Sequence, residues 1–463
     1  MLLLRILIIL VVQLAIAFSA SAQCIRASVG LPGNTEPALL GTSVSIHGDL
    51  AVIGAPLQVG VTDWASGRVH VYRFDGVDWA LEAELVAEDG ATGDMFGISV
   101  DTDGQRIVVG AWFEDTAFSN DGAAYVFYKP DESDWILEQK LVAMMPRPEA
   151  TFGRTVAVDG GAIAIGSPLD STLGSASGRV HVFEQVSGVW SEQAQLQSPF
   201  QQPLERFGLA LDMEGSRLAV GASWADTERG AVHIFDRDGD GWSHTQEIND
   251  PSGENGDQFG FDVALAGNWL GIGAYKADGL QTDSGKVDFY QRIAGNWTLQ
   301  ASFDGDLFGS EAQFGVSVAM ENDLAVVGSR YGTVDGGSSS TGAVSAFRLV
   351  NGDWLRGIDL VSPDVGFEAE FGWQVAVSGE AGIVGAPYAG EPVPQTGGAF
   401  FLDLETGCGG VPGDLNGDGL VNGGDLGLLL SVFGPCRGCP ADLNNDDVVN
   451  GGDLGLLLVF WSV

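Results

Sequence analysis

Basic side chains are scarce in this sequence, which has 21 lysines and arginines against 62 aspartates and glutamates and a net charge of −41. Such a charge repels nucleic-acid phosphates and anionic lipid headgroups, so neither is an expected partner. After residue 22 no apolar run reaches the roughly 18 residues that a membrane-spanning helix needs. We therefore expect no nucleic-acid binding and no direct membrane insertion.

Residues that commonly carry catalysis are also few. Three of the five histidines, His70, His181 and His233, fall at one position of a repeat and are expected to be structural strand residues. The sequence has no nucleophile elbow, phosphate-binding loop or histidine-rich metal motif. Acidic residues are too numerous for one catalytic pair to be singled out. We expect a protein that is not an enzyme.

The N-terminal segment predicts export. Residues 1–22 contain Arg5, an apolar run from Ile6 to Phe18 and the small residues Ala20-Ser21-Ala22. This order of charge, apolar stretch and small-residue site is typical of a secretory signal that is cleaved before Gln23. The mature protein is expected to be secreted or associated with the cell surface.

A repeat of 52 to 57 residues runs through most of the chain. A Phe-Gly pair, Leu-Gly in the first copy, places its glycine at Gly41, Gly97, Gly153, Gly208, Gly260, Gly315 and Gly372. Thirteen residues later a β-branched run ends in another glycine, at Gly54, Gly110, Gly166, Gly221, Gly273, Gly328 and Gly385. Seven units of this kind predict a repeat architecture.

Each unit has room for four short strands. A third apolar run follows the second glycine, and in six units a tryptophan opens a fourth: Trp79, Trp135, Trp190, Trp242, Trp297 and Trp354. Four strands a unit predict an all-β, seven-bladed β-propeller over residues 23–407. We expect the six tryptophans to pack the outer strands, although a glycan-stacking role for one of them stays open. "DRDGDGW" at 236–242 is interpreted as a hairpin turn.

The Phe-Gly and Gly-Ala-Pro pattern resembles the FG-GAP repeats of the integrin α-chain head over about residues 24–407. The resemblance implies a propeller that serves as a platform for a protein or glycan ligand. Integrin-type repeats often hold calcium between their first two strands, but the fixed step of 13 residues leaves no room for that cage here. Length varies mainly in the loops between the second and third strands, which would open on one acidic, hydroxyl-rich face. A solvated rim without a ligand is the alternative interpretation.

The seventh unit lacks its tryptophan strand. The tryptophans precede the next Phe by 17 residues, and 17 residues before Leu40 lies Gln23. We therefore expect the segment "QCIRASVG" to return as the outer strand of blade 7, which would leave no open sheet edge. This closure would bring Cys24 and Cys408 to opposite sides of one turn, where a disulfide is geometrically reasonable.

The chain ends in two similar acidic loops. The predicted calcium ligands of the first loop are Asp414, Asn416, Asp418, the Leu420 carbonyl, Asn422 and Asp425, and those of the second are Asp442, Asn444, Asp446, the Val448 carbonyl, Asn450 and Asp453. These residues occupy positions 1, 3, 5, 7, 9 and 12 of a twelve-residue calcium loop. The second loop has Asp447 in place of the turn glycine and is expected to bind more weakly. An Asp/Gly-rich surface turn is the alternative.

Each loop leads into one short helix, expected at 426–433 and 454–461. Paired loop-helix units with Asp at position 12 resemble the dockerin family over about residues 412–463. The resemblance implies a small α-helical, calcium-binding domain at 414–463, after a linker at 408–413, that attaches to a cohesin-like or surface protein. Loop positions 10 and 11, which usually contact the partner, are Gly423-Gly424 and Gly451-Gly452 here.

Cys436 and Cys439 lie between the two loops in "GPCRGCP". Their spacing matches a redox or zinc half-motif, but an exported chain without a second nearby pair favours a local disulfide.

Three functions remain: a secreted calcium-dependent interaction or adhesion protein, which we favour; a component of a polysaccharide-degrading system; and a structural coat protein.

Overall fold

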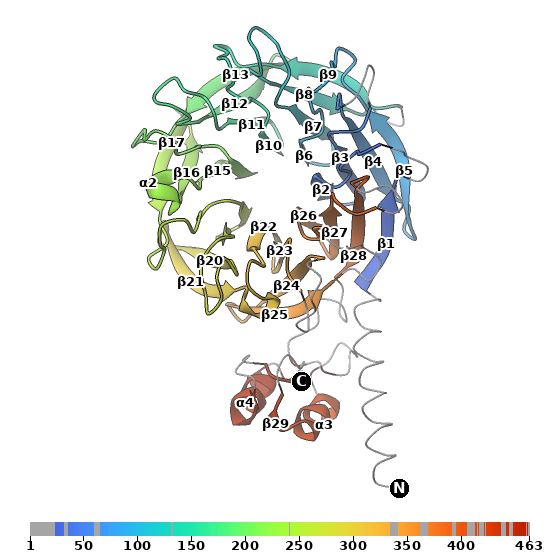
Figure 1. Ribbon diagram of the computed structural model, residues 1–463, viewed down its shortest axis with the longest axis vertical. Coiled ribbons are helices and arrows are strands. Elements are labelled where there is room, and N and C mark those ends of the chain that lie inside the picture. Colours follow the sequence, from blue (N-terminus) through green and yellow to red (C-terminus); the bar gives the residue numbers. More distant parts are fainter. Residues whose placement is uncertain are drawn as a thin grey trace.

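The computed structural model shows a ring of four-stranded antiparallel sheets followed by a short helical segment (Figure 1). It describes residues 24–31, 36–59, 65–130, 133–239, 241–333, 341–361, 369–390, 395–404, 413, 415, 421, 423–436, 441–443, 448–459 and 461. Seven sheets of four strands confirm the predicted seven-bladed propeller. The predicted signal segment, residues 1–22, lies outside the described residues.

In the first four blades the strands follow chain order from the axis outward. Blade 1 has β2 (Ser43–His47), β3 (Leu50–Ala55), β4 (Arg68–Phe74) and β5 (Trp79–Leu85). Blade 2 has β6 (Ser99–Thr102), β7 (Arg106–Ala111), β8 (Ala123–Tyr128) and β9 (Ile136–Leu141). Blade 3 has β10 (Thr155–Asp159), β11 (Ala162–Ser167), β12 (Arg179–Val186) and β13 (Val189–Leu196). Blade 4 has β14 (Ala210–Glu214), β15 (Arg217–Ala222), β16 (Ala231–Asp238) and β17 (Gly241–Ile248), with the short turn α2 (Ala225–Glu228).

The next two blades repeat this order, and the seventh departs from it. Blade 5 has β18 (Val263–Ala266), β19 (Trp269–Ala274), β20 (Lys286–Ile293) and β21 (Asn296–Asp304), followed by the 3-10 turn η1 (Asp306–Phe308). Blade 6 has β22 (Phe314–Glu321), β23 (Leu324–Ser329), β24 (Ala343–Val350) and β25 (Asp353–Leu360). Blade 7 has β26 (Val375–Ser378), β27 (Ala381–Ala386) and β28 (Gly398–Asp403), and takes its outer strand from elsewhere in the chain.

The outer strand of blade 7 is the N-terminal strand β1 (Ile25–Gly30), which pairs antiparallel with β28 (Figure 1). The predicted closure of the ring by the N-terminal segment is therefore confirmed. Cys24, directly before β1, is fully buried. Neither Cys24 nor Cys436 is free in the described structure, whereas Cys408 and Cys439 lie outside the described residues, so the two pairings stay predictions.

Two glycines in each unit hold neighbouring blades together. The N–H of Gly153 donates to the Gly166 carbonyl of its own blade at 3.1 Å, while its carbonyl lies against Gly110 of the preceding blade. A Cβ on Gly110 would stand 1.9 Å from that oxygen, and the corresponding distances in the other six blades are 2.0 to 2.2 Å. Gly153 also has a φ of +88°, which disfavours any residue with a side chain. The constant step of 13 residues in the sequence therefore reflects a repeated contact between two backbones.

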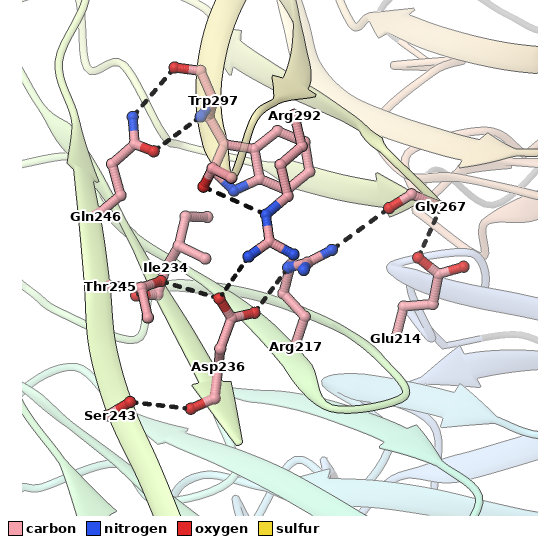
Figure 2. A network of polar contacts seen from close by, with 11 residues as sticks. Glu214, Arg217, Ile234, Asp236, Ser243, Thr245, Gln246, Gly267, Arg292 and Trp297 are labelled. Carbon is pink, nitrogen blue, oxygen red and sulfur yellow. Dashed lines mark hydrogen bonds and ion pairs between the residues drawn. The ribbon is translucent and has the colours of Figure 1, made fainter. Parts of the chain in front are cut away.

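The tryptophans on the outer strands pack against the preceding blade, as the sequence predicts. Trp190, Trp297 and Trp354 are almost fully buried. Gln246 of β17 clasps the backbone of Trp297 in the next blade: its Nε2 donates to the Trp297 carbonyl at 3.1 Å, and its Oε1 accepts from the Trp297 N–H at 2.8 Å (Figure 2). Gln139 makes the same pair of hydrogen bonds to Trp190. Packing between neighbouring blades therefore explains why a tryptophan recurs on the outer strand.

The C-terminal segment contains α3 (Gly423–Ser431) and α4 (Gly451–Val459), with the two-residue strands β29 (Gly434–Pro435) and β30 (Val448–Val449) paired between them. Its small core consists of Val421, Leu429, Ala441, Val449 and Leu457. Both helices begin three residues before the predicted starts at 426 and 454, so the expected boundaries were wrong. In α4 the Asn450 side chain explains the early start, because its Oδ1 accepts the Gly452 N–H at 2.7 Å and caps the helix.

Candidate functional site

The position-12 aspartates of the two predicted calcium loops have equivalent surroundings. Asp425 is fully buried and accepts the N–H of Leu415 at 2.7 Å. Asp453 is also fully buried and accepts the N–H of Leu443 at 2.8 Å. In both loops the backbone N–H at loop position 2 thus donates to the carboxylate at position 12. The repeated sequence therefore folds into a repeated local structure.

Of the other predicted ligands, Asp442 is buried, Asn450 is half-buried and Val448 is exposed. The Asn450 Nδ2 donates to the Val448 carbonyl at 2.8 Å. Outside the described residues lie Asp414, Asn416, Asp418, Leu420, Asn422, Asn444 and Asp446. No group of three potential metal-ligating His, Cys, Asp or Glu side chains occurs in the part of the tail that is described. The calcium sites therefore stay predictions.

The donor chemistry of the tail fits calcium. Residues 413–463 contain seven aspartates and one basic residue, Arg437. Asp425, Asp442 and Asp453 are buried, and buried carboxylates require a compensating charge or strong hydrogen bonds. Oxygen ligands from aspartate, asparagine and backbone carbonyls are those that calcium prefers. The described residues are therefore compatible with the predicted ion.

The three repeat-aligned histidines lie in three different blades and form no common site. His70 contacts Gln58 Oε1 at 2.8 Å, and burial lowers its pKa. His181 contacts Glu192 Oε1 at 2.8 Å. His233 lies 3.3 Å from His244, and burial, together with that neighbour, lowers the pKa of His233 to about 3. All three side chains are buried in strands, as the sequence predicts.

The sequence "DRDGDGW" forms a hairpin, as expected. Asp238 at the end of β16 pairs with Gly241 at the start of β17. Asp236 bridges two blades, since its carboxylate accepts from Arg217 Nε at 2.9 Å and from Arg292 Nη2 at 3.2 Å (Figure 2). This aspartate therefore acts as an ion-pair partner on the face that carries the hairpins.

Connections alternate between the two faces of an antiparallel ring. The loops between the second and third strands and the connections between blades share one face, here called the loop face. They are joined by parallel bridges such as Gly122 to Phe152 and Gly178 to Phe207. The residue before the Phe is left-handed in every blade, at Leu39, Met95, Thr151, Arg206, Gln258, Gln313 and Glu370. This repeated left-handed conformation is a feature that the sequence did not reveal.

The loop face of blades 2 to 4 exposes large apolar side chains. This apolar rim consists of Phe118, Met144, Met145, Leu173, Phe200 and Leu204, whose exposed fractions range from 39 to 69%. The sequence predicted a face that is acidic and rich in hydroxyls, and the prediction missed these residues because most of them lie in the connections between blades. Apolar residues gathered on one face often mark an interaction site.

Near the axis the same face carries arginines that rest on aromatic rings. Arg154 lies 4.9 Å from the ring centroid of Trp112, and Arg206 lies 3.5 Å from that of Trp224. Arg330 lies 5.1 Å from the ring of Trp373. Sequence reasoning did not single out these residues, although Arg154 stands at a position where five other units have an apolar residue.

Three aspartates lie on the innermost strands or next to them. The carboxylate of Asp212 accepts the Leu265 N–H of the next blade at 2.6 Å, and Asp101 and Asp262 make similar contacts to Val158 and Val318. Burial, together with the charges of Asp101 and Asp262, raises the pKa of Asp212 to about 7. Burial raises the pKa values of Asp101 and Asp262 to about 6. Each of these acids thus accepts a backbone N–H from the innermost strand of the next blade.

Comparison with known families agrees with this geometry. The model of the FG-GAP repeat matches residues 79–127, 135–183 and 242–287. The chain carries FG-GAP repeats. The first two matched segments run from the tryptophan strand of one blade to the third strand of the next, so the FG-GAP unit spans the junction between blades. No curated protein matches the chain.

An FG-GAP propeller suggests a ligand-binding or adhesion-type platform. Its rigid part is the set of glycine contacts between blades, and its variable part is the loop face. None of the helices among the described residues has the length and apolar character needed to span a bilayer.

Proposed function

We propose that this protein is an exported, calcium-binding interaction or adhesion protein that binds a ligand on its loop face and is attached through its C-terminal tail. The observation that carries the proposal is the apolar rim on the loops of blades 2 to 4. A rim of this kind provides contact area, and the hydrogen-bonded loops beneath it hold that area in one conformation.

The tail supports the second half of the proposal. Asp425 and Asp453 occupy the same position in two repeated loops and are both fully buried. Calcium would supply the positive charge that these buried carboxylates need, with Asp442, Asn450 and the Val448 carbonyl among the residues that would hold it. Its dockerin-like pattern favours attachment to a cohesin-like or surface protein, and Gly423-Gly424 and Gly451-Gly452 would give that partner a backbone surface rather than hydroxyl groups.

Binding of the labelled full-length protein to cells of the source organism tests the proposal. We expect saturable binding that Phe118→Ser combined with Phe200→Ser reduces at least tenfold, since each change removes an exposed aromatic anchor. The matched control is Val186→Ser combined with Val189→Ser, which removes two valines that are 51 and 54% exposed on the opposite face. Equal loss in both double variants, or no saturable binding by the unaltered protein, would contradict the assignment of the loop face.

The carbohydrate-related alternative is tested separately. Incubation of the protein with a panel of polysaccharides should release no reducing ends if the propeller is a binding platform. Release of reducing ends would favour a role in a polysaccharide-degrading system. For the structural-coat alternative, calcium-dependent self-association in sedimentation would be the decisive observation.

A further inference from the structure

Two arginines lie near each other on the loop face, where the chain enters the innermost strands of blades 3 and 4. Arg154 follows Gly153 at the entrance to blade 3, and Arg206 precedes Phe207 at the entrance to blade 4. Both residues are half-buried, and each guanidinium lies over an indole ring, of Trp112 and Trp224 respectively. Such stacking holds a guanidinium in place while its edge remains able to donate hydrogen bonds.

Within the described chain, neither arginine forms an ion pair with a carboxylate. The contrast is with the opposite face, where Arg217 and Arg292 share Asp236 (Figure 2). On the same face Arg237 lies 2.5 Å from Glu184. In a chain with three times as many acidic as basic residues, ion-pair partners for arginine are abundant. Arg179 and Arg330 also lack a carboxylate partner among the described residues, but each donates a hydrogen bond to a glutamine side chain, which Arg154 and Arg206 do not.

The surroundings of the pair explain why it retains binding capacity. Glu228, which interacts electrostatically with Arg206, accepts a hydrogen bond from Gln258 Nε2 at 2.7 Å. The Nε of Arg206 is buried and has no hydrogen-bond partner among the described residues. Burial and the charge of Arg206 lower the pKa of Arg154 to about 10. Two cationic groups that repel each other in a partly desolvated place would be stabilised by a bound anion.

The neighbouring side chains indicate what carries the anion. The connections that hold Arg154 and Arg206 also contribute Met144, Met145, Phe200 and Leu204 to the apolar rim. A flat guanidinium matches the two oxygens of a carboxylate, whereas the rim matches apolar side chains on either side of it. A protein segment supplies both kinds of group.

We propose that Arg154 and Arg206 form a docking site for a carboxylate side chain carried by an acidic and apolar segment of a partner protein. The inference rests on the proposed function, since it assigns a ligand class to the loop face. A uronic acid would offer the same carboxylate without the apolar flanks, and the experiment separates the two sources.

The test uses full-length protein and a fluorescein-labelled peptide in which glutamate alternates with leucine, followed by fluorescence anisotropy at low salt. We expect binding that Arg154→Gln and Arg206→Gln each weaken by roughly tenfold or more, because each removes a charge-assisted hydrogen bond. Arg237→Gln removes the same charge from the opposite face and should change the affinity less than twofold. A peptide with glutamine in place of glutamate should not bind.

A second measurement needs no variant. The peptide should slow the modification of Arg154 and Arg206 by phenylglyoxal, seen by mass spectrometry of the digested protein, and leave the modification of Arg237 unchanged. The inference would be overturned if the peptide did not bind, or if the Arg154→Gln and Arg206→Gln variants bound it as tightly as the unaltered protein. It would also be overturned if the peptide did not slow the modification of the two arginines. Oligogalacturonate could displace the labelled peptide as effectively as the unlabelled peptide does, and Phe200→Ser could leave the affinity for the peptide unchanged. Together these two results would identify the occupant as a sugar and overturn the assignment of a protein segment.

The outcomes are independent of those of the cell-binding experiment. Cell binding that depends on Phe118 and Phe200 but not on the arginines would leave the proposed function standing and refute the carboxylate site. Peptide binding that depends on the arginines, without binding to cells, would support the site and refute the adhesion function.

Discussion

The replacement of Gly110 by alanine tests the contact on which the ring is built. The backbone of Gly110 lies outside the left-handed region, so alanine can adopt its conformation. Its new Cβ would stand 1.9 Å from the Gly153 carbonyl oxygen and 2.3 Å from Ser99 Oγ, whereas ordinary contacts begin at 3.4 Å. Both obstacles are held in place, because Ser99 Oγ donates to that same carbonyl at 2.9 Å. Blades 2 and 3 therefore have to separate.

The expected cost combines two effects. Forcing a methyl group into a packed place costs about 1–3 kcal/mol, and loss of the Ser99 hydrogen bond adds about 0.5–1.5 kcal/mol. We expect Gly110→Ala to reduce the free energy of unfolding by about 1.5–4.5 kcal/mol. Ser99→Ala alone should cost about 1 kcal/mol, which separates the hydrogen bond from the overlap.

Gly161→Ala is the matched control, since Gly161 lies in the turn between the first two strands of blade 3 and a Cβ there meets no atom within 4 Å. Its φ is not positive, so the substitution should be neutral or stabilising by about 0.4–1 kcal/mol through the unfolded chain. The measurement is urea unfolding followed by tryptophan fluorescence, at one calcium concentration for all variants. Equal unfolding midpoints for Gly110→Ala and Gly161→Ala would refute the account of the glycine pairs.

Three further predictions concern other parts of the molecule. Gln246→Ala should lower the free energy of unfolding by about 1–3 kcal/mol in urea unfolding, because both hydrogen bonds to the Trp297 backbone are lost; an unchanged midpoint would contradict this. The raised pKa of Asp212 gives stability that is present below the ordinary carboxyl pKa and lost as pH rises through about 7. The melting temperature should accordingly fall more steeply between pH 5 and 8 for the unaltered protein than for Asp212→Ala. Equal slopes of melting temperature against pH in the two proteins would contradict this prediction. In the tail, chelation should unfold α3 and α4 and leave the propeller intact, and Asp414→Ala should weaken calcium binding, measured calorimetrically, more than Asp442→Ala; the reverse order would show that the second loop is the stronger.

The architecture was predictable because each repeat contains a fixed contact. Gly110 and Gly153 belong to successive units, and the close approach of their backbones tolerates no side chain at either position. A pattern with this cause survives in every copy, so the number of blades can be counted from the sequence. The N-terminal closure followed from the same spacing, since β1 occupies the place that the tryptophan strand has in the other blades.

Other structural features could not be predicted, because no particular residue type marks them in the sequence. The left-handed residues before each Phe are as different as Leu39, Thr151 and Glu370, because hydrogen bonds between blades impose their conformation. The helices of the tail were placed too late because Gly423-Gly424 and Gly451-Gly452 have low helix propensity. The Asn450 cap and the packing of Leu457 outweigh that propensity in α4.

The position after each Phe-Gly pair shows where the repeat is free to vary. The fold fixes the glycine itself by its φ and its contacts, but the next residue differs in every blade: Thr42, Ile98, Arg154, Leu209, Phe261, Val316 and Trp373. Since the scaffold demands nothing specific there, a charged residue at this position needs a reason other than packing. Arg154 has no ion-pair partner among the described residues, and burial together with Arg206 lowers its pKa. The presence of two such arginines beside an apolar rim is what the binding of an anionic ligand would explain.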